Sequence, residues 1–405
     1  MEKVVIIGNG IAGHSALQEI LKKGRDFDIT VVWNEVPRTY VRTQIINYAM
    51  GRVKEDKFYL SREDYYKEKG VHSIHAEVTD LDPMARQVTL SNGEGLPYDR
   101  LIIATGSYNF VPPVKAEGHS TLTTIDSSSI RDLAGVYTMR NLKDAEGFGR
   151  DLQTARNAVV SGGGLLGLEA AGSLVDAGLD VTTVEFAPRL LPRQLDRDSS
   201  ALFQKQAEAY GLTFILGDSI DTVFFEEDQP VRVRLVSGRE LKCDLLLFSI
   251  GVRSNIAPFL EKLTIGRGIQ IDDYAQTSDP NIFCCGDAAE YKGLVYGNWG
   301  FSSNSGKTAG QNAAGQHNVM KPYVLNTLFH SLGTRVFSTG LVDFDDPDLK
   351  SYTRGEADKD YVKLFFRDDR LTAGILMGDT TRGQKLARAI DAGMGYEEAV
   401  ETFGR

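Results

Sequence analysis

The sequence contains few cysteines and no long apolar run. Three cysteines among 405 residues are too few for a disulfide framework. No apolar stretch reaches the roughly 18 residues that suggest a membrane-spanning helix. The first apolar strand begins by about residue 3, so we expect no room for a signal peptide. Together these features favour a protein of the reducing cytoplasm.

A positive net charge is also missing. The chain has 45 Lys and Arg against 55 Asp and Glu, a formal net charge of −10. Such a balance argues against generic binding of nucleic acid or anionic membranes, so we expect neither as a partner. The 6 histidines show no metal-ligand spacing, and we expect no metal site.

The sequence does contain the same glycine-rich loop twice. Each copy follows an apolar strand and precedes a helix, and the two sets of glycines are Gly8, Gly10 and Gly13, then Gly162, Gly164 and Gly167. In G-x-G-x-x-G the first glycine allows a tight turn, the second lets a pyrophosphate approach, and the third lets the helix pack on the strand. The helix N-terminus adds free N–H groups and partial positive charge. Two such loops predict two bound dinucleotides.

A carboxylate follows each loop at the end of the next strand. Glu35 and Glu185 stand where a Rossmann-type acid accepts hydrogen bonds from the ribose hydroxyls. A carboxylate repels a 2′-phosphate, so Glu185 favours NAD(H) over NADP(H). Arg189 lies four residues later and keeps a dual preference open.

The two halves of the chain repeat one α/β unit. Hairpin-like strands are expected near 75–81 and 87–90, and again near 213–216 and 231–236, before buried strands at 98–106 and 242–251. From about residue 319 the pattern changes to strands at 335–342, 361–366 and 371–377, then helices at 382–393 and 396–403. Strands grouped before helices predict a small α+β domain. The acidic stretch 343–360 predicts a solvated loop.

A third element completes the pattern. The apolar strand 281–285 ends in Gly286-Asp287, Ala104-Thr105-Gly106 closes the first half, and the segment 249–255 closes the second, with Ser254 in place of a usual proline. In this order the motifs strongly resemble the FAD-dependent pyridine nucleotide-disulfide oxidoreductase superfamily, over residues 1 to about 318. The resemblance implies two Rossmann-like, glutathione-reductase-like domains, one for FAD and one for NAD(H).

The resemblance also implies domain limits and contact residues. The expected domains are an FAD-binding domain at 1–112 and 242–318, an NAD(H)-binding domain at 113–241, and the α+β domain at 319–405. The implied FAD contacts are Gly8, Gly10, Ile11, Ala12, Gly13, Glu35, Arg42, Val78, Ala104, Thr105, Gly106, Gly286, Asp287 and Trp299. The implied NAD(H) contacts are Gly162, Gly164, Leu165, Leu166, Gly167, Glu185, Gly251 and Glu169, whose carboxyl would position the nicotinamide or instead pair with a lysine.

The redox cysteines of that superfamily are absent. Residues 40–50, where its disulfide reductases carry a C-x4-C pair, contain no cysteine. A thiolate relay needs a thiolate, so it would depend on Cys243, Cys284 or Cys285. Each lies in an apolar strand, which indicates a structural role. Reduced flavin must then pass its electrons to another molecule.

Two further segments resemble the ferredoxin, rubredoxin and nitrite reductase branch of the superfamily. Tyr40-Val41-Arg42 is similar to its P-Y-x-R segment, with Thr39 replacing the proline and Asn47 replacing a later lysine. Trp299 and the helix around 305–312 are similar to the helix under the flavin ring, with Ser305 where glutamine is usual.

That likeness implies an NADH-dependent FAD enzyme that exchanges electrons with a protein carrier. The partner would be a small acidic electron-carrier protein, such as rubredoxin or ferredoxin, or an iron–sulfur partner subunit. Two alternatives stay open. One is an NADH oxidase or quinone-type small-molecule reductase, and the other is an NADH-sensing flavoprotein with little turnover.

Overall fold

The computed structural model describes residues 1–24, 26–130, 133–340, 343–344 and 346–404. The chain divides into two compact units, and each is interleaved in sequence with the other. The first unit comprises Met1–Asn109, Arg140–Leu142 and Val252–Tyr323, and the second comprises Phe110–Met139, Lys143–Gly251 and Val324–Arg405. No helix in the described part of the chain is both long and apolar enough to cross a bilayer.

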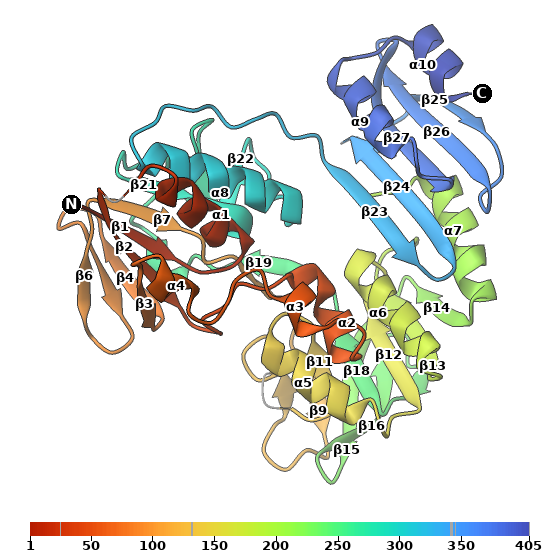
Figure 1. The fold of residues 1–405 in the computed structure, drawn as a ribbon. Helices are drawn as coiled ribbons and strands as arrows, with labels where there is room; N and C mark the ends of the chain where they lie inside the picture. Colours follow the sequence, from red (N-terminus) through yellow and green to blue (C-terminus); the bar gives the residue numbers. More distant parts are fainter. Residues whose placement is uncertain (25, 131–132, 341–342, 345, 405) are drawn as a thin grey trace. The chain divides into compact units, whose positions relative to one another are not determined.

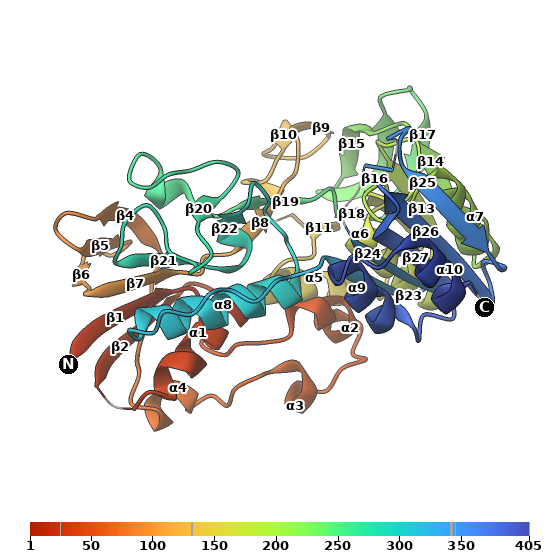
Figure 2. The ribbon, with the colours of Figure 1, turned by 90° about the horizontal axis from the view of Figure 1, so that it is seen from above.

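The first unit is built on a parallel five-stranded sheet (Figure 1). Its strands lie in the order β21 (Ile282–Cys284), β7 (Arg100–Ile103), β1 (Glu2–Ile7), β2 (Phe27–Trp33) and β3 (His72–His75). Four successive residues of β1, Val4 to Ile7, are at most 5% exposed, as expected for a strand covered on both faces. Helices α1 (Ile11–Leu21) and α8 (Trp299–Ala313) lie side by side on this sheet (Figure 2).

Shorter elements complete the first unit. Between β2 and β3 run η1 (Arg42–Gln44), α2 (Ile45–Ala49), α3 (Glu55–Phe58) and α4 (Tyr65–Glu68). A three-stranded sheet contains β4 (Val78–Asp82), β5 (Gln87–Leu90) and β6 (Gly95–Pro97), which confirms the first expected hairpin. Two small pairs join β8 (Ser107–Asn109) to β19 (Val252–Ser254), and β20 (Ile269–Ile271) to β22 (Ala289–Tyr291).

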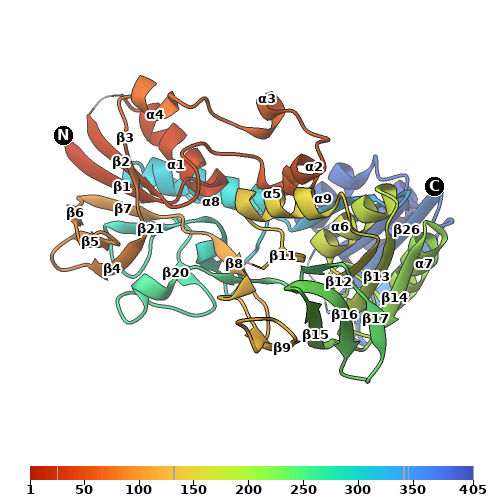
Figure 3. The same cartoon turned by 90° about the horizontal axis from the view of Figure 1, so that it is seen from below.

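The second unit repeats the parallel sheet. Its strands lie in the order β11 (Val136–Thr138), β18 (Leu245–Phe248), β12 (Asn157–Ser161), β13 (Asp180–Glu185) and β14 (Leu212–Leu216). Helices α5 (Leu142–Asp151), α6 (Leu165–Asp176) and α7 (Arg197–Ala209) connect successive strands. A mixed sheet of β10 (Thr124–Ile125), β9 (Val114–Glu117), β15 (Ile220–Glu226), β16 (Gln229–Leu235) and β17 (Glu240–Lys242) shares a core with this sheet (Figure 3).

The structure corrects the second expected hairpin. Residues 213–216 belong to β14, which pairs in parallel with β13, because α7 provides the crossover that a parallel pair needs. The hairpin is formed by β15 and β16, with Glu227 and Asp228 at positive φ in the turn. Strand β18 pairs with β12 and β11 and so belongs to the second unit. The chain therefore returns to the first unit at Val252, ten residues after the expected boundary at residue 242.

The C-terminal part is an antiparallel sheet with two helices on one face (Figure 1). The strands lie in the order β23 (Asn326–Ser331), β24 (Thr334–Gly340), β27 (Arg370–Gly378), β26 (Asp360–Arg367) and β25 (Lys350–Arg354), and the helices are α9 (Gly383–Asp391) and α10 (Tyr396–Phe403). This confirms an α+β arrangement. The stretch 343–360, expected to be a loop, contains β25. Strand β23 was not expected and precedes the first expected strand, 335–342. Residues 341–342 of the expected strand lie outside the described residues.

The contact between α1 and α8 depends on glycine. A Cβ on Gly310 would lie 2.3 Å from Ala16 O, and a Cβ on Gly306 would lie 2.3 Å from Ala12 O. Both neighbours are backbone atoms of α1, which cannot turn aside as a flexible side chain does. The two helices therefore approach one another more closely than any other residue would allow.

We predict that Gly310→Ala lowers the free energy of unfolding by about 1–3 kcal/mol, because the added methyl overpacks the contact between α1 and α8. Urea titration of the FAD-loaded protein measures this. Lys307→Ala, at an exposed position of the same helix, should change stability by less than about 0.5 kcal/mol. Equal effects of the two substitutions would contradict the close approach.

Candidate functional site

The first candidate site lies in the first unit, where β1 turns into α1. Gly8 has φ +100°, and a Cβ there would lie 2.2 Å from Ala104 O. A Cβ on Gly13 would lie 2.0 Å from Gly8 O. The protein's own packing therefore requires both glycines.

Packing within the protein does not explain why the middle residue of the loop is glycine. Apart from its chain neighbours, no heavy atom of the described residues lies within 4 Å of a Cβ placed on Gly10, and the same holds for Gly164 of the second loop. Gly162 and Gly167 are packed as tightly as their counterparts, with Cβ positions 2.2 Å from Ser249 O and 2.1 Å from Gly162 O. Since folding does not need glycine at the open position, its missing side chain fits the approach of a ligand. The residues present therefore fit two dinucleotides.

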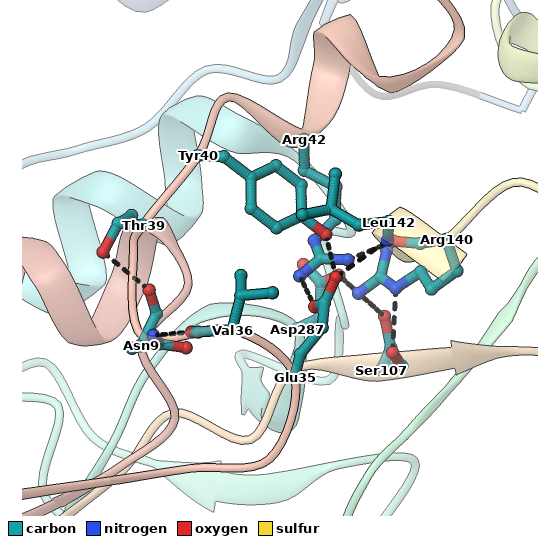
Figure 4. A network of polar contacts seen from close by, with 10 residues as sticks. All are labelled: Asn9, Glu35, Val36, Thr39, Tyr40, Arg42, Ser107, Arg140, Leu142 and Asp287. Carbon is teal, nitrogen blue, oxygen red and sulfur yellow. Dashed lines mark hydrogen bonds and ion pairs between the residues drawn. The ribbon is translucent and has the colours of Figure 1, made fainter. Parts of the chain in front are cut away.

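Glu35 lies at the centre of a polar network beside the first loop (Figure 4). Its Oε2 accepts a hydrogen bond from Arg42 Nη2 at 2.8 Å, and its Oε1 accepts from Tyr40 Oη at 2.5 Å and from Leu142 N at 3.0 Å. The carboxylate thus lies just after the end of β2, close to where it was expected, and its partners among the described residues are two side chains and one backbone amide. Contact of Glu35 with a ribose stays a prediction.

Asp287 anchors the opposite side of the same network. Its Oδ2 accepts hydrogen bonds from Ser107 Oγ at 2.7 Å and Arg140 Nη2 at 3.2 Å, and its Oδ1 accepts from Ser302 Oγ at 3.3 Å. Gly286, with φ +72°, brings this carboxylate against the first loop, since a Cβ there would lie 2.9 Å from Ala12 Cβ. The structure therefore brings the Gly-Asp motif and the first glycine loop together.

Two partly buried guanidinium groups lie between these carboxylates. Arg42 donates to the backbone oxygen of Arg140, and Arg140 donates to Ser107 O at 2.9 Å (Figure 4). Burial alone would lower the pKa of Arg42, but Tyr40 and Glu35 raise it above its usual range. Burial and the neighbouring Arg42 lower the pKa of Arg140, against the opposing effect of Asp287. Two cations and two carboxylates thus alternate through the site.

Sequence reasoning missed Arg140, Ser107 and Leu142. Among the described residues from Phe110 to Gly251, only the segment Arg140–Leu142 belongs to the first unit. Its position at the end of β11, a strand of the other unit's sheet, was the one available signal. Residues at the carboxyl ends of parallel strands are where α/β folds bind ligands.

The remaining predicted FAD contacts lie at the ends of strands and at the starts of helices of the first unit, or in its core. Ala104, Thr105 and Gly106 follow β7, and Thr105 Oγ1 donates to Asn255 O at 2.7 Å. Ile11 and Ala12 open α1, and Trp299 opens α8 as a half-buried residue. Val78 begins β4 and is 9% exposed within the core of the first unit.

Ser305, which replaces a usual glutamine, has a structural partner. It is fully buried in α8, and its Oγ accepts a hydrogen bond from Gly286 N at 3.0 Å. The short side chain therefore ties α8 to the Gly-Asp motif. Although serine replaces the usual glutamine, its hydroxyl still fixes the backbone of Gly286 by this hydrogen bond.

The second candidate site lies in the second unit, where β12 turns into α6. Glu185 ends β13, and its Oε2 accepts a hydrogen bond from Gly163 N at 2.5 Å while its Oε1 accepts from Ala187 N at 2.7 Å. Leu165 and Leu166 open α6, and Leu166 is 50% exposed. Gly251 has φ +107° with no heavy atom of the described residues, chain neighbours aside, within 4 Å of its Cβ position. Glu185 is therefore placed beside the second loop, as expected.

Glu169 lies in the second turn of α6 and is half-buried. Burial raises the pKa of Glu169 to about 7. Among the described residues, no hydrogen bond or ion pair to its carboxyl is found, so the expected alternative of a lysine partner has no support. A carboxyl group in this condition changes its charge near neutral pH.

The three cysteines are free and fully buried. Burial raises the pKa of Cys243 and Cys285 to about 12, and raises that of Cys284 well above its usual value. Such thiols are inert, which agrees with a structural role for all three. The described residues contain no group of His, Cys, Asp and Glu side chains that could hold a metal ion.

The comparisons with known proteins cover nearly the whole chain. Residues 2–314 match the model of the family "Pyridine nucleotide-disulphide oxidoreductase", and residues 326–394 match the "Rubredoxin NAD+ reductase C-terminal domain". The chain is 31% identical over 393 residues to the nitrite reductase [NAD(P)H] of Bacillus subtilis (strain 168), covering 95% of this chain and 46% of that protein. It thus spans about half the length of the first curated relatives that it matches.

Another relative matches this chain over nearly all of both sequences. The NADH-rubredoxin oxidoreductase of Clostridium acetobutylicum is 26% identical over 398 residues, covering 98% of this chain and 96% of that protein. A solved NAD-dependent persulfide reductase from A. fulgidus has the same fold, with a TM-score of 0.89 and 24% identity over 98% of this chain and 78% of that one. With both glycine loops, the Gly-Asp motif and these matches, the chain belongs to the pyridine nucleotide-disulphide oxidoreductase family, whose members are FAD-dependent and use NAD(H).

Proposed function

We propose that this protein is an FAD-dependent oxidoreductase that moves electrons between NAD(H) and a protein electron carrier without a redox-active disulfide. The observation that carries the proposal is the presence of two open glycine cradles, at Gly10 and Gly164, in a chain whose cysteines are all buried. Electrons that enter from NADH have no thiolate within the chain to receive them. Their acceptor is therefore another molecule.

The proposed carrier is a small acidic protein such as rubredoxin or ferredoxin, or an iron–sulfur partner subunit. The match of residues 326–394 to a rubredoxin reductase domain supports this. Three reduced cysteines favour a reducing compartment, and we place the reaction in the cytoplasm.

In this proposal the first loop holds FAD. The backbone at Gly10 and the N-terminus of α1 bind the pyrophosphate, Glu35 binds the ribose, and Asp287 lies at the ribityl chain. Arg42 and Arg140 supply positive charge to the phosphate region. Bound FAD would supply the change from two-electron hydride transfer to one-electron transfer.

The second loop holds NAD(H) in the same way. The backbone at Gly164 and the N-terminus of α6 bind the pyrophosphate, and Glu185 accepts from the ribose hydroxyls. Glu169 lies one turn into α6 and positions the nicotinamide end. Hydride transfer to flavin needs no protein base, so the task of these residues is to bind and orient.

The first test concerns the acceptor. We predict that NADH reduces the bound flavin within seconds in a stopped-flow experiment, and that cytochrome c reduction stays negligible until rubredoxin or ferredoxin is added. Slow or absent flavin reduction would favour the sensor alternative. Rapid turnover with oxygen alone would replace the carrier proposal with the oxidase alternative.

The second test concerns Glu185. Glu185→Gln removes the negative charge that repels a 2′-phosphate, so the preference for NADH over NADPH should fall roughly tenfold, equivalent to about 1.4 kcal/mol. The ratio of kcat/KM for the two nucleotides measures this. Glu208→Gln, at an exposed position of α7, is the matched control and should leave the ratio unchanged. An unchanged ratio in Glu185→Gln would show that this carboxylate is not at the ribose.

The third test uses the raised pKa of Glu169, about 7. A carboxyl whose pKa is raised by folding binds more protons in the folded than in the unfolded state, so the stability of the folded state decreases as pH rises from about 4.5 to 7. Glu169→Gln is always neutral and escapes this loss. We therefore predict that the variant gains stability relative to the natural protein between pH 5 and pH 8.

Thermal unfolding of the FAD-loaded proteins across that range measures the difference. Glu208→Gln again serves as the control and should run parallel to the natural protein. A constant difference between Glu169→Gln and the natural protein at all pH values would refute the raised pKa.

A further inference from the structure

Within the second unit, a buried ion pair joins the C-terminal sheet to the N-terminus of α7. Lys363 lies in β26 with 7% of its side chain exposed, and its Nζ lies 2.5 Å from Asp196 Oδ2 and 3.0 Å from Asp198 Oδ2. Only 10% of the Asp196 side chain is exposed. Burying two opposite charges costs free energy that their attraction does not always recover. A buried pair is therefore weak evidence for a role in stability, and we ask which segments it holds in place.

Asp196 is the last residue of the linking segment, residues 186–196, which runs from Glu185 to the start of α7. Its Oδ1 caps α7 by accepting from Ser199 N at 3.3 Å. A second strand of the C-terminal sheet holds the same segment, because Ser338 Oγ donates to Gln194 O at 2.7 Å. The C-terminal sheet therefore fixes the end of the linking segment at two points.

The middle of the linking segment is fastened to the second glycine loop. Leu191 N donates to Gly163 O at 3.0 Å, and Leu190 packs so closely that a Cβ on Gly163 would lie 2.7 Å from its Cδ2. Ser200 Oγ, from α7, donates to Leu190 O at 2.8 Å. Any shift of the linking segment would thus move the loop backbone whose amide binds Glu185.

The backbone at Leu191 is held both by the linking segment and by its surroundings, since Leu191 O accepts from Gln194 N and Leu195 N, each at 2.9 Å. Leu191 is fully buried and has φ +49°, in the left-handed region that leucine disfavours. A residue keeps such a conformation only where its surroundings over-determine it. Here the surroundings are the glycine loop on one side and, three to five residues later, the bonds of Ser338 and Lys363.

We propose that Lys363 and Ser338 of the C-terminal sheet are positioning residues for the NAD(H) site. They hold the linking segment against Gly163, and so set the affinity for NADH and the preference over NADPH. This inference rests on the proposed binding of NAD(H) at the second loop. It gives the C-terminal part of the chain a role in binding the electron donor, in addition to any contact with the acceptor.

The experiment compares three substitutions of lysine in the FAD-loaded protein. Lys363→Met keeps the apolar stem and removes the charge, and the Kd for NADH should rise about tenfold. The preference for NADH over NADPH should fall, while the rate of flavin reduction at saturating NADH should change by less than about twofold. Lys363→Arg keeps the charge and should recover most of the affinity.

Lys350→Met, in the adjacent strand β25, is the matched control because its lysine is 69% exposed and pairs with an exposed Asp369. Its Kd for NADH should stay within about twofold of the natural protein. If Lys363→Met is folded and FAD-loaded but binds NADH with unchanged Kd and preference, the inference is wrong.

Ser338→Ala makes the test independent of whether Lys363→Met folds. It removes one hydrogen bond to Gln194 O, and the Kd for NADH should rise about threefold. An unchanged Kd in Ser338→Ala overturns the inference when Lys363→Met does not fold. If Glu185→Gln alone alters nucleotide binding, the proposed NAD(H) site stands and the positioning role fails. If Glu185→Gln also has no effect, the proposed contact of Glu185 with NAD(H) fails together with the positioning role.

Discussion

The structure depends on one constraint, the close approach of bare backbone at the turn between strand and helix. In both units the first glycine of the loop lies against a carbonyl oxygen at the end of a neighbouring strand, Ala104 O or Ser249 O. The third glycine then lies against the carbonyl of the first. These contacts fix the loop without help from a ligand, and they leave only the middle glycine with open space. The proposed binding sites therefore take their shape from contacts within the protein.

The same loop serves two sites because the charges around it differ. Beside the first loop, Glu35 and Asp287 alternate with Arg42 and Arg140, so carboxylates and guanidinium groups are held in contact. Beside the second loop, Glu185 accepts only backbone amides among the described residues. The first arrangement suits a phosphate group, which binds to cations, whereas the second suits hydroxyls, which donate hydrogen bonds to a carboxylate. Local charge, not loop geometry, is therefore the basis on which we propose FAD for the first loop and NAD(H) for the second.

The sequence predicted the features that depend on local pattern. Both loops, Glu35, Glu185, the Gly-Asp motif and the α+β character of the C-terminal part follow from motif spacing and strand periodicity. Features that depend on pairing between distant segments were missed. Arg140 joins the first unit from a stretch of the chain that otherwise belongs to the second, and Lys363 finds Asp196 from 167 residues away. No local period marks such residues, because their partners are chosen by the tertiary fold.

The segment that lacks redox cysteines is not simply an empty version of its relatives. Within the first unit, Tyr40 stacks on Phe58 with ring centroids 5.0 Å apart, and Tyr48 stacks on Phe58 at 4.2 Å. Phe58 is fully buried, so an aromatic core occupies the stretch where related disulfide reductases carry their cysteine pair. Offset aromatic stacks pack rigidly and offer no redox-active sulfur. Aromatic packing thus gives this segment a structural role that needs no thiol, which is consistent with the proposed use of a separate acceptor molecule.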